Sequence, residues 1–122
     1  MVNVLLIDDA VALREVALAV LNDGGYNVVV AEHGRAALDK LAADPRVGLV
    51  VCDINMPVMN GIDFIEAFRL LPGHAQTPVV VLSGATAGEA KLAARQAGAT
   101  AWLTKPFRPA SLLDMVRKLV PP

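Results

Sequence analysis

The sequence predicts an α/β protein in which a five-stranded parallel sheet is covered by helices on both faces, and three observations support this class. Short runs of Val, Leu and Ile alternate with segments whose apolar residues recur at helical spacing. Hydrophobic residues make up 55% of the 122 residues and charged residues 19%, which is too apolar for a disordered chain. The runs are almost continuously apolar, which is typical of parallel strands that are buried on both faces.

Five short apolar runs are the expected strands, and turn residues bound each of them. They lie at Val4–Ile7, Val28–Val30, Leu49–Cys52, Val79–Leu82 and Trp102–Thr104. Strands that alternate with helices are joined by right-handed crossovers, so we expect a doubly wound, flavodoxin-like (βα)5 sandwich of three layers.

The first two helices are indicated by apolar residues at i, i+3, i+4, i+7 and i+8. The first helix ends at Gly24 and Gly25, and its predicted buried face consists of Leu13, Val16, Ala17, Val20 and Leu21. The second helix follows Gly34 and stops near Pro45, and its face consists of Ala37, Leu38, Leu41 and Ala42.

The last three helices follow the same pattern. The third begins beyond Gly61 and is ended by Pro72 and Gly73, with an apolar face of Phe64, Ile65, Phe68 and Leu71. The fourth, from Thr86 to Ala97, has a face of mostly alanine; it buries little area, so we expect it to be loosely packed and mobile. The fifth begins with Pro109 in its first turn and presents Leu112, Met115, Val116, Leu119 and Val120.

Composition narrows the class of protein. Residues 1–122 have the length of one compact domain, and eleven Lys and Arg against twelve Asp and Glu give no basic field for nucleic acid or anionic membrane. Any partner is therefore expected to be a protein. The single cysteine, Cys52, cannot form an internal disulfide and is read as a small core residue. With no signal peptide or bilayer-spanning segment expected, we predict a cytoplasmic monomer.

Charged residues close three of the predicted strands. Asp8 and Asp9 follow the first strand, Asp53 follows the third, and Lys105 follows the fifth. Two strand orders are plausible for this chain, and the order 2-1-3-4-5 would bring the three acids together at the switch point between the first and third strands. Three carboxylates and one ammonium are the groups needed to hold a divalent cation and to transfer a phosphoryl group through an aspartate. The residue chemistry therefore favours that order.

Four segments carry a resemblance to a known family. They are LLIDDA, VVCDINMPVMNG, VVVLSGA and AWLTKPF, which occur in this order along the whole chain. The chain resembles the receiver domains of two-component response regulators, and within them the stand-alone chemotaxis proteins of the CheY-like type. The resemblance implies a phosphorylatable signalling switch rather than an enzyme.

The resemblance also implies site residues. Asp53 would accept a phosphoryl group from a phosphohistidine of a sensor histidine kinase or phosphotransfer protein. Mg²⁺ would be held by Asp9, Asp53 and the main-chain carbonyl of Asn55, with Asp8 acting directly or through a water. Lys105, preceding a cis proline bond, would offset charge on the phosphoryl oxygens, and the Ser83 hydroxyl would bind one of them and trigger the switch.

The switch would change an output surface for a downstream target protein. Trp102 occupies a place where receivers often carry a tyrosine or phenylalanine that moves inward on activation, so its own movement stays open. Ala85 and Asn55 would flank the path of water to the acyl phosphate and tune its lifetime. The candidates for partner contact lie on the fourth helix and near the fifth, although a solvated helix face explains them equally well: Glu89, Lys91, Arg95 and Arg108.

Alternatives exist for single residues and for the whole chain. Asp8 and Asp9 could cap the first helix, Asp53 could form a turn with the Asn55 amide, and Ser83 could be an ordinary turn residue. A phosphatase with an aspartate nucleophile would need a second acid where Asn55 stands, and a flavin protein would need a phosphate-binding loop where two acids stand. The open alternatives are a receiver used as a non-phosphorylated interaction module, or one excised from a hybrid kinase or a DNA-binding regulator. His33 and His74 are expected in loops, which disfavours a role as phosphohistidine donors.

Overall fold

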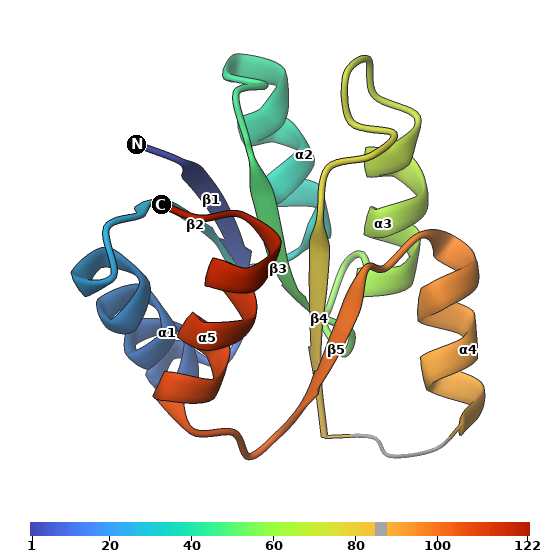
Figure 1. Ribbon diagram of the computed structural model, residues 1–122. Coiled ribbons are helices and arrows are strands. Elements are labelled where there is room, and N and C mark those ends of the chain that lie inside the picture. The colour runs from blue at the N-terminus through green and yellow to red at the C-terminus, as the bar shows by residue number, and fades with distance from the viewer. Residues whose placement is uncertain (85–87) are drawn as a thin grey trace.

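The computed structural model describes residues 1–84 and 88–122, where five strands alternate with five helices (Figure 1). The strands are β1 (Asn3–Ile7), β2 (Asn27–Ala31), β3 (Leu49–Asp53), β4 (Val79–Ser83) and β5 (Ala101–Thr104). The helices are α1 (Val11–Asp23), α2 (Gly34–Ala43), α3 (Gly61–Arg69), α4 (Gly88–Ala97) and α5 (Pro109–Leu119). In the described ranges, no helix is long and apolar enough to span a bilayer.

The strands form one parallel sheet in the order β2-β1-β3-β4-β5, which confirms the order that the charged residues favoured. In the register of this sheet Ile7 lies opposite Cys52, and Asp53 lies opposite Leu82. The carboxyl ends of β1, β3 and β4 are therefore neighbours. The chain changes its direction of propagation between β1 and β3, where open α/β sheets bind ligands.

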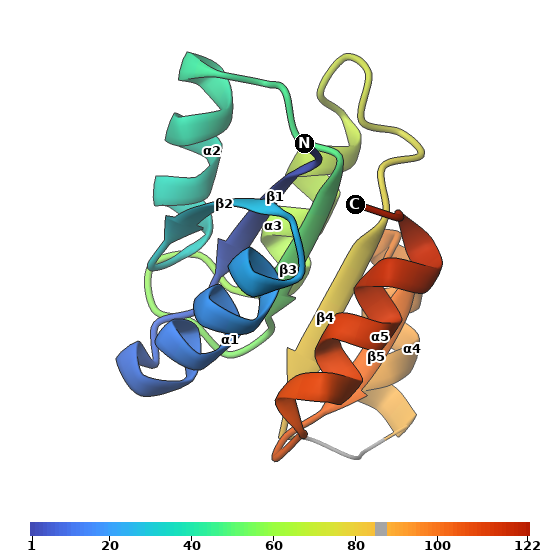
Figure 2. The same cartoon turned by 60° about the vertical axis from the view of Figure 1, so that its left-hand side comes forward.

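Helices cover both faces of the sheet, as expected. Helices α1 and α5 lie side by side on one face, and α2, α3 and α4 lie on the other (Figures 1 and 2). Alternate residues of β1 divide between the two cores, because Leu5 packs with Phe64 and Phe68 whereas Leu6 packs with Leu21 and Leu112. Every residue of β3 and β4 is buried, which explains why these strands are continuous apolar runs in the sequence.

Side chains define the start of several helices. The His33 ring accepts a hydrogen bond from the Ala36 N–H and caps α2, and the Asn60 side chain accepts from the Asp63 N–H and caps α3. Pro109 occupies the first turn of α5, where its missing N–H costs nothing, as the sequence predicted.

The structure corrects four details of the predicted helices. Ala42 is exposed, because the buried face of α2 is narrower than predicted and consists of Gly34, Ala37 and Leu41. Val16 is 45% exposed, because the buried face of α1 is narrower than predicted and centres on Ala17 and Leu21. Helix α3 ends at Arg69, so Leu71 lies beyond it, although Leu71 still packs against the core. Val120 is likewise the residue that follows α5, and it remains partly buried.

Helix α4 has the smallest buried face, as its alanine-rich sequence predicted. Ala94 is its buried residue, whereas α3 buries Gly61, Phe64, Ile65 and Phe68. Within the described range the helix begins at Gly88, and the predicted start at Thr86 lies outside the described residues. Its mobility stays a prediction.

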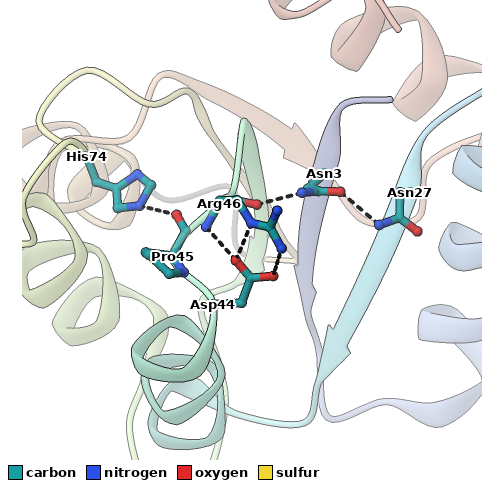
Figure 3. Close-up of polar contacts among 6 residues, drawn as sticks. All are labelled: Asn3, Asn27, Asp44, Pro45, Arg46 and His74. Carbon is teal, nitrogen blue, oxygen red and sulfur yellow. Dashed lines mark hydrogen bonds and ion pairs between the residues drawn. The ribbon is translucent and has the colours of Figure 1, made fainter.

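Polar contacts tie the loops at the amino ends of the strands, opposite the charged residues. The Asn27 side-chain amide donates to the Asn3 side chain, which in turn donates to the main-chain carbonyl of Arg46 (Figure 3). The Arg46 guanidinium donates to both carboxylate oxygens of Asp44 at 2.9 and 3.0 Å. These contacts join β2, β1 and the loop before β3.

His74 extends this network to the loop before β4. Its Nε2 lies 2.9 Å from the carbonyl oxygen of Pro45, which can only accept (Figure 3). Its Nδ1 lies 2.9 Å from Thr77 Oγ1. The ring is buried and stacks on Phe68 with the centroids 4.6 Å apart. His74 therefore has a structural role, as does His33, which caps α2.

Candidate functional site

The acids predicted at the strand ends converge because β1 and β3 are adjacent. Asp8 follows β1 directly, and Asp53 is the last residue of β3. One carboxylate oxygen from each of Asp8, Asp9 and Asp53 lies within 4.8 Å of the others. Asp8 and Asp53 are 1% and 5% exposed, while Asp9 faces solvent. The cluster therefore has two buried members and one that opens to solvent.

Two of the carboxylates also form local turns. Asp8 Oδ1 accepts a hydrogen bond from the Ala10 N–H at 2.9 Å, and Asp53 Oδ1 accepts one from the Asn55 N–H at 3.3 Å. The turn interpretation of Asp53 is therefore compatible with its place in the cluster. Neither Asp8 nor Asp9 is the N-cap of α1, because that position is Ala10, which makes no side-chain cap.

Lys105 joins the two buried acids. Its Nζ lies 3.3 Å from Asp8 Oδ2 and 3.2 Å from Asp53 Oδ2, and its side chain is 20% exposed. The main-chain N–H of Lys105 donates to the Ser83 carbonyl at 2.8 Å, which fixes the start of this loop against β4. The Lys105–Pro106 peptide bond is cis, as the resemblance implied.

The electrostatics of the site are dominated by burial. Burial raises the pKa of the Asp53 carboxyl above its ordinary value, the Lys105 ammonium opposes this rise, and the Asp8 carboxylate adds to it. Burial also raises the pKa of the neighbouring Cys52 thiol, which donates to the Asp53 carbonyl and lies in the core as predicted. Two buried carboxylates share one ammonium here, so the site favours a further cation.

The donor set fits a hard divalent cation. Three carboxylates close together at one sheet edge supply the oxygen ligands that Mg²⁺ prefers, and the exposed Asp9 leaves a side open to water. Asn55 is exposed beside them, two residues after Asp53. These residues could hold such an ion, and nothing in their chemistry would favour a soft metal.

Ser83 and Trp102, the predicted switch residues, lie on the two strands beyond β3. Ser83 is fully buried at the end of β4, and its residue pair in the register is Thr104 on β5. Trp102 is half-buried, and its indole N–H donates to Thr104 Oγ1 at 3.3 Å, which supplies the partner that the indole requires. Ala85 lies outside the described residues.

A cavity of about 270 Å³ separates α4 from β5 beside Trp102. Lys91 and Arg95, two of the predicted contact residues, line it together with Leu92, which is 53% exposed. Glu89 and Arg108 are exposed but do not line this cavity. The predicted output residues thus divide into two that border a hollow and two on the open surface.

Sequence reasoning missed two structural roles at the site. Gly61 lies so close to the end of β3 that a Cβ on it would fall 2.3 Å from the Asp53 carbonyl oxygen. Arg14 reaches back from α1 and donates to the Asp8 carbonyl at 2.9 Å. Glycine after a breaker-rich loop is a weak signal of close approach, and a main-chain partner such as the Asp8 carbonyl leaves no signal in the sequence.

Comparison with known proteins places this arrangement in a family. Residues 4–117 match the model of the response regulator receiver domain. The sensory/regulatory protein RpfC of Xanthomonas campestris is 38% identical over 96% of this chain, and the transcriptional regulatory protein CpxR of Escherichia coli is 35% identical over 97%. The chain spans 16% and 49% of these two proteins.

A solved structure agrees over nearly the whole fold. The chemotaxis protein CheY4 of Vibrio cholerae has a TM-score of 0.93 and 38% identity, covering 98% of this chain and 99% of that one. The strand order, the acid cluster and the sequence matches lead to one family. The chain belongs to the response regulator receiver domains, which are signalling switches of two-component systems rather than classical enzymes.

Proposed function

We propose that residues 1–122 form one receiver domain in which Asp53 is the phosphoacceptor. The observation that carries this proposal is the position of Lys105 Nζ, within 3.3 Å of both buried carboxylates. A fixed ammonium beside a nucleophilic carboxylate stabilises the negative charge that gathers on a transferring phosphoryl group. Asp53 is the better acceptor of the two buried acids because it ends its strand beside the exposed loop of Asn55.

The reaction is a transfer from phosphohistidine to carboxylate. An Asp53 oxygen forms a bond to phosphorus while the bond from phosphorus to the histidine nitrogen breaks, and the imidazole leaves with the electron pair. The product is an acyl phosphate on Asp53. Lys105, released from its shared contact with Asp8 and Asp53, would pair with the phosphoryl oxygens.

A divalent cation completes this site in our proposal. Asp8, Asp9, Asp53 and the main-chain carbonyl of Asn55 would hold Mg²⁺, which when bound supplies charge neutralisation for the phosphoryl oxygens. Asp9 is exposed and would leave room for the water that this ion retains. The three close carboxylate oxygens support the assignment.

In this proposal, phosphorylation changes the surface around Ser83, Trp102 and α4. The Ser83 hydroxyl would bind a phosphoryl oxygen, and this new contact would bias the position of the end of β4. Trp102 and the cavity between α4 and β5 would report or transmit the change to a target protein. The phosphodonor partner would be a histidine kinase or a phosphotransfer protein. The chemotaxis subtype, the monomeric state and the cytoplasmic location stay predictions.

A direct test uses Trp102, the only tryptophan of the chain. We expect Mg²⁺ with a small-molecule phosphodonor, or a beryllium fluoride mimic, to change Trp102 fluorescence, and intact-mass measurement to show one added phosphoryl group. Asp53→Asn should abolish the added mass. Asp63→Asn, which removes an exposed acid from the first turn of α3, is the matched control and should leave it unchanged. Wild-type protein that gains no mass would instead support a non-phosphorylated interaction module.

A further inference from the structure

Arg14 occupies an unfavourable place in its own helix. It is the fourth residue of α1, whose first turn contains no acidic residue and whose N-cap, Ala10, makes no side-chain cap. A cation near a helix N-terminus is opposed by the macrodipole, which favours anions there. Glu15, the nearest acid of α1, is adjacent in sequence and so does not face Arg14, and no acid of the helix lies three or four residues away from it.

The structure supplies a partner for Arg14 at Asp8. Arg14 Nη1 donates to the main-chain carbonyl of Asp8 at 2.9 Å, and this charge-assisted bond satisfies a carbonyl of a residue that is 1% exposed. Three other contacts hold Asp8: its N–H donates to the Ala31 carbonyl at 3.2 Å, its Oδ1 accepts from Ala10, and its Oδ2 pairs with Lys105 at 3.3 Å. Arg14 thus provides the fourth point that fixes this residue, and it is the one that binds the Asp8 carbonyl.

The Asp8 carbonyl also controls Asp9. A peptide group is planar, so the carbonyl oxygen of Asp8 and the Cα of Asp9 lie in one rigid unit. Asp9 is exposed, and its carboxylate nevertheless comes within 4.8 Å of the two buried ones. Holding the Asp8 oxygen therefore fixes the peptide plane to which the Asp9 Cα is attached, and this limits the directions that the Asp9 side chain can take.

We propose that Arg14 is a positioning residue of the cation site: it orients the Asp8–Asp9 peptide so that both carboxylates face Asp53. This inference rests on the proposed function, because it concerns the affinity for Mg²⁺. Charge and position predict opposite results when Arg14 is neutralised. If Arg14 acted only through its charge, removing it would strengthen cation binding; if it acts through position, removing it weakens binding.

Calorimetric titration of the metal-free protein with Mg²⁺ distinguishes a role through charge from a role through position. We expect Arg14→Met, which keeps an apolar stem and loses all donors, to bind Mg²⁺ about tenfold more weakly than wild type. Arg14→Lys should recover most of the affinity, because one guanidinium nitrogen makes the contact and an ammonium can replace it. The charge control is Arg35→Met, because the Arg35 side chain is exposed on α2 and pairs with Asp39. This variant should bind Mg²⁺ as wild type does.

The outcomes separate this inference from the proposed function. Arg14→Met that binds Mg²⁺ as tightly as wild type, or more tightly, overturns the positioning role while leaving the receiver function intact. Wild-type protein that binds no Mg²⁺ overturns both. Thermal unfolding in EDTA checks that each variant is folded; if Arg14→Met does not fold, Arg14→Ala, which also lacks a donor, replaces it, and equal affinities of the Ala and Lys variants contradict the proposal.

Discussion

Gly61 lies against the main-chain carbonyl of Asp53, and a Cβ at residue 61 would fall 2.3 Å from that oxygen and 2.9 Å from the Cα of Ile54. The Gly61 N–H also donates to the Ile54 carbonyl at 2.9 Å. The loop that leaves β3 must therefore return to within contact distance of the strand end before α3 can begin. This close approach closes the loop beneath the acid cluster and needs a residue without a side chain.

Gly61→Ala should disturb both stability and the site. The atoms that a methyl group would meet belong to the backbone, which cannot move aside as a flexible side chain can, so we expect a loss of about 1–3 kcal/mol in the free energy of unfolding. Urea denaturation followed by Trp102 fluorescence measures it. The control is Gly88→Ala, because a Cβ there meets no atom within 4 Å. Equal stabilities of the two variants would contradict the prediction.

Val58 is strained and should be improvable. Its φ is +69°, a region that β-branched residues avoid, and the Met59 N–H closes a tight turn around it by donating to the Pro57 carbonyl at 2.7 Å. The side chain is 78% exposed and buries little area. Val58→Asn should therefore raise the free energy of unfolding by about 1 kcal/mol, since Asn tolerates this conformation.

Val58→Ala is the matched control for this strain. Alanine removes the branched side chain but keeps the Cβ that disfavours positive φ, so it should gain less stability than Asn. Chemical denaturation of the two variants in parallel measures the difference. If alanine stabilises as much as asparagine, positive φ is not the cause.

The Asp53 carboxyl should contribute stability to the metal-free protein as the pH falls through its raised pKa toward the ordinary carboxyl value. The pKa of Asp53 is raised in the folded state, so the folded protein takes up a proton more readily than the unfolded chain between the ordinary carboxyl value and the raised one. Asp53→Asn should accordingly be more stable than wild type at neutral pH in EDTA, with the advantage shrinking as the pH falls through the raised pKa. Lys105 keeps its contact with Asp8 in this variant.

Asp44 should change the stability with pH in the direction opposite to Asp53. The hydrogen bonds from Arg46 lower the pKa of Asp44 from 3.8 to about 2, so its contribution is present above 3.8 and is lost as the pH falls toward 2. Urea midpoints of Asp44→Asn should therefore follow those of wild type in parallel between about pH 5 and 7. An Asp53→Asn curve that stays parallel to wild type at every pH above the ordinary carboxyl value of 3.8 would show that burial does not raise the Asp53 pKa.

Arg69 should be important for stability although it has no acidic partner among the described residues. Its guanidinium donates to the Gly98 carbonyl through Nε and Nη2 at 3.2 and 2.6 Å, and through Nη1 to the His74 and Thr77 carbonyls at 2.9 and 2.5 Å. Burial lowers the pKa of Arg69, yet the four contacts keep the charge hydrogen-bonded. Arg69→Met should cost about 2 kcal/mol because buried carbonyls lose their donor.

The control for Arg69 is Arg95→Met on the exposed side of α4, which should change the free energy of unfolding little. Arg69→Lys should recover part of the loss, since an ammonium cannot reach the Gly98, His74 and Thr77 carbonyls together as the planar guanidinium does. Thermal and urea unfolding rank the stabilities of the wild type and the three variants. A loss in Arg95→Met as large as that in Arg69→Met would mean that charge, rather than the carbonyl contacts, is responsible.

The order and type of the elements could be read from the sequence because local patterns specify them. The runs Val4–Ile7 and Val79–Leu82 are continuous apolar strands since parallel strands are buried on both faces, and each lies within an observed strand. The strand order also followed, because only neighbouring ends of β1 and β3 bring Asp8 and Asp53 together. Patterns failed at helix faces and ends, where Val16 is exposed and Leu71 lies outside α3, since the neighbours decide how wide a face is covered.

By itself the sequence determined the fold class, the family and the identity of the charged residues at the sheet edge, because spacing and residue type express these directly. Only the tertiary structure decided that Lys105 bridges two carboxylates, that Arg14 holds the Asp8 carbonyl and that Gly61 meets Asp53. The Lys105 contacts depend on distances between segments far apart in the chain, whereas the other two join residues close in sequence and end on main-chain oxygen atoms. Every residue carries such an oxygen, so no residue type in the sequence reveals which one will be bound.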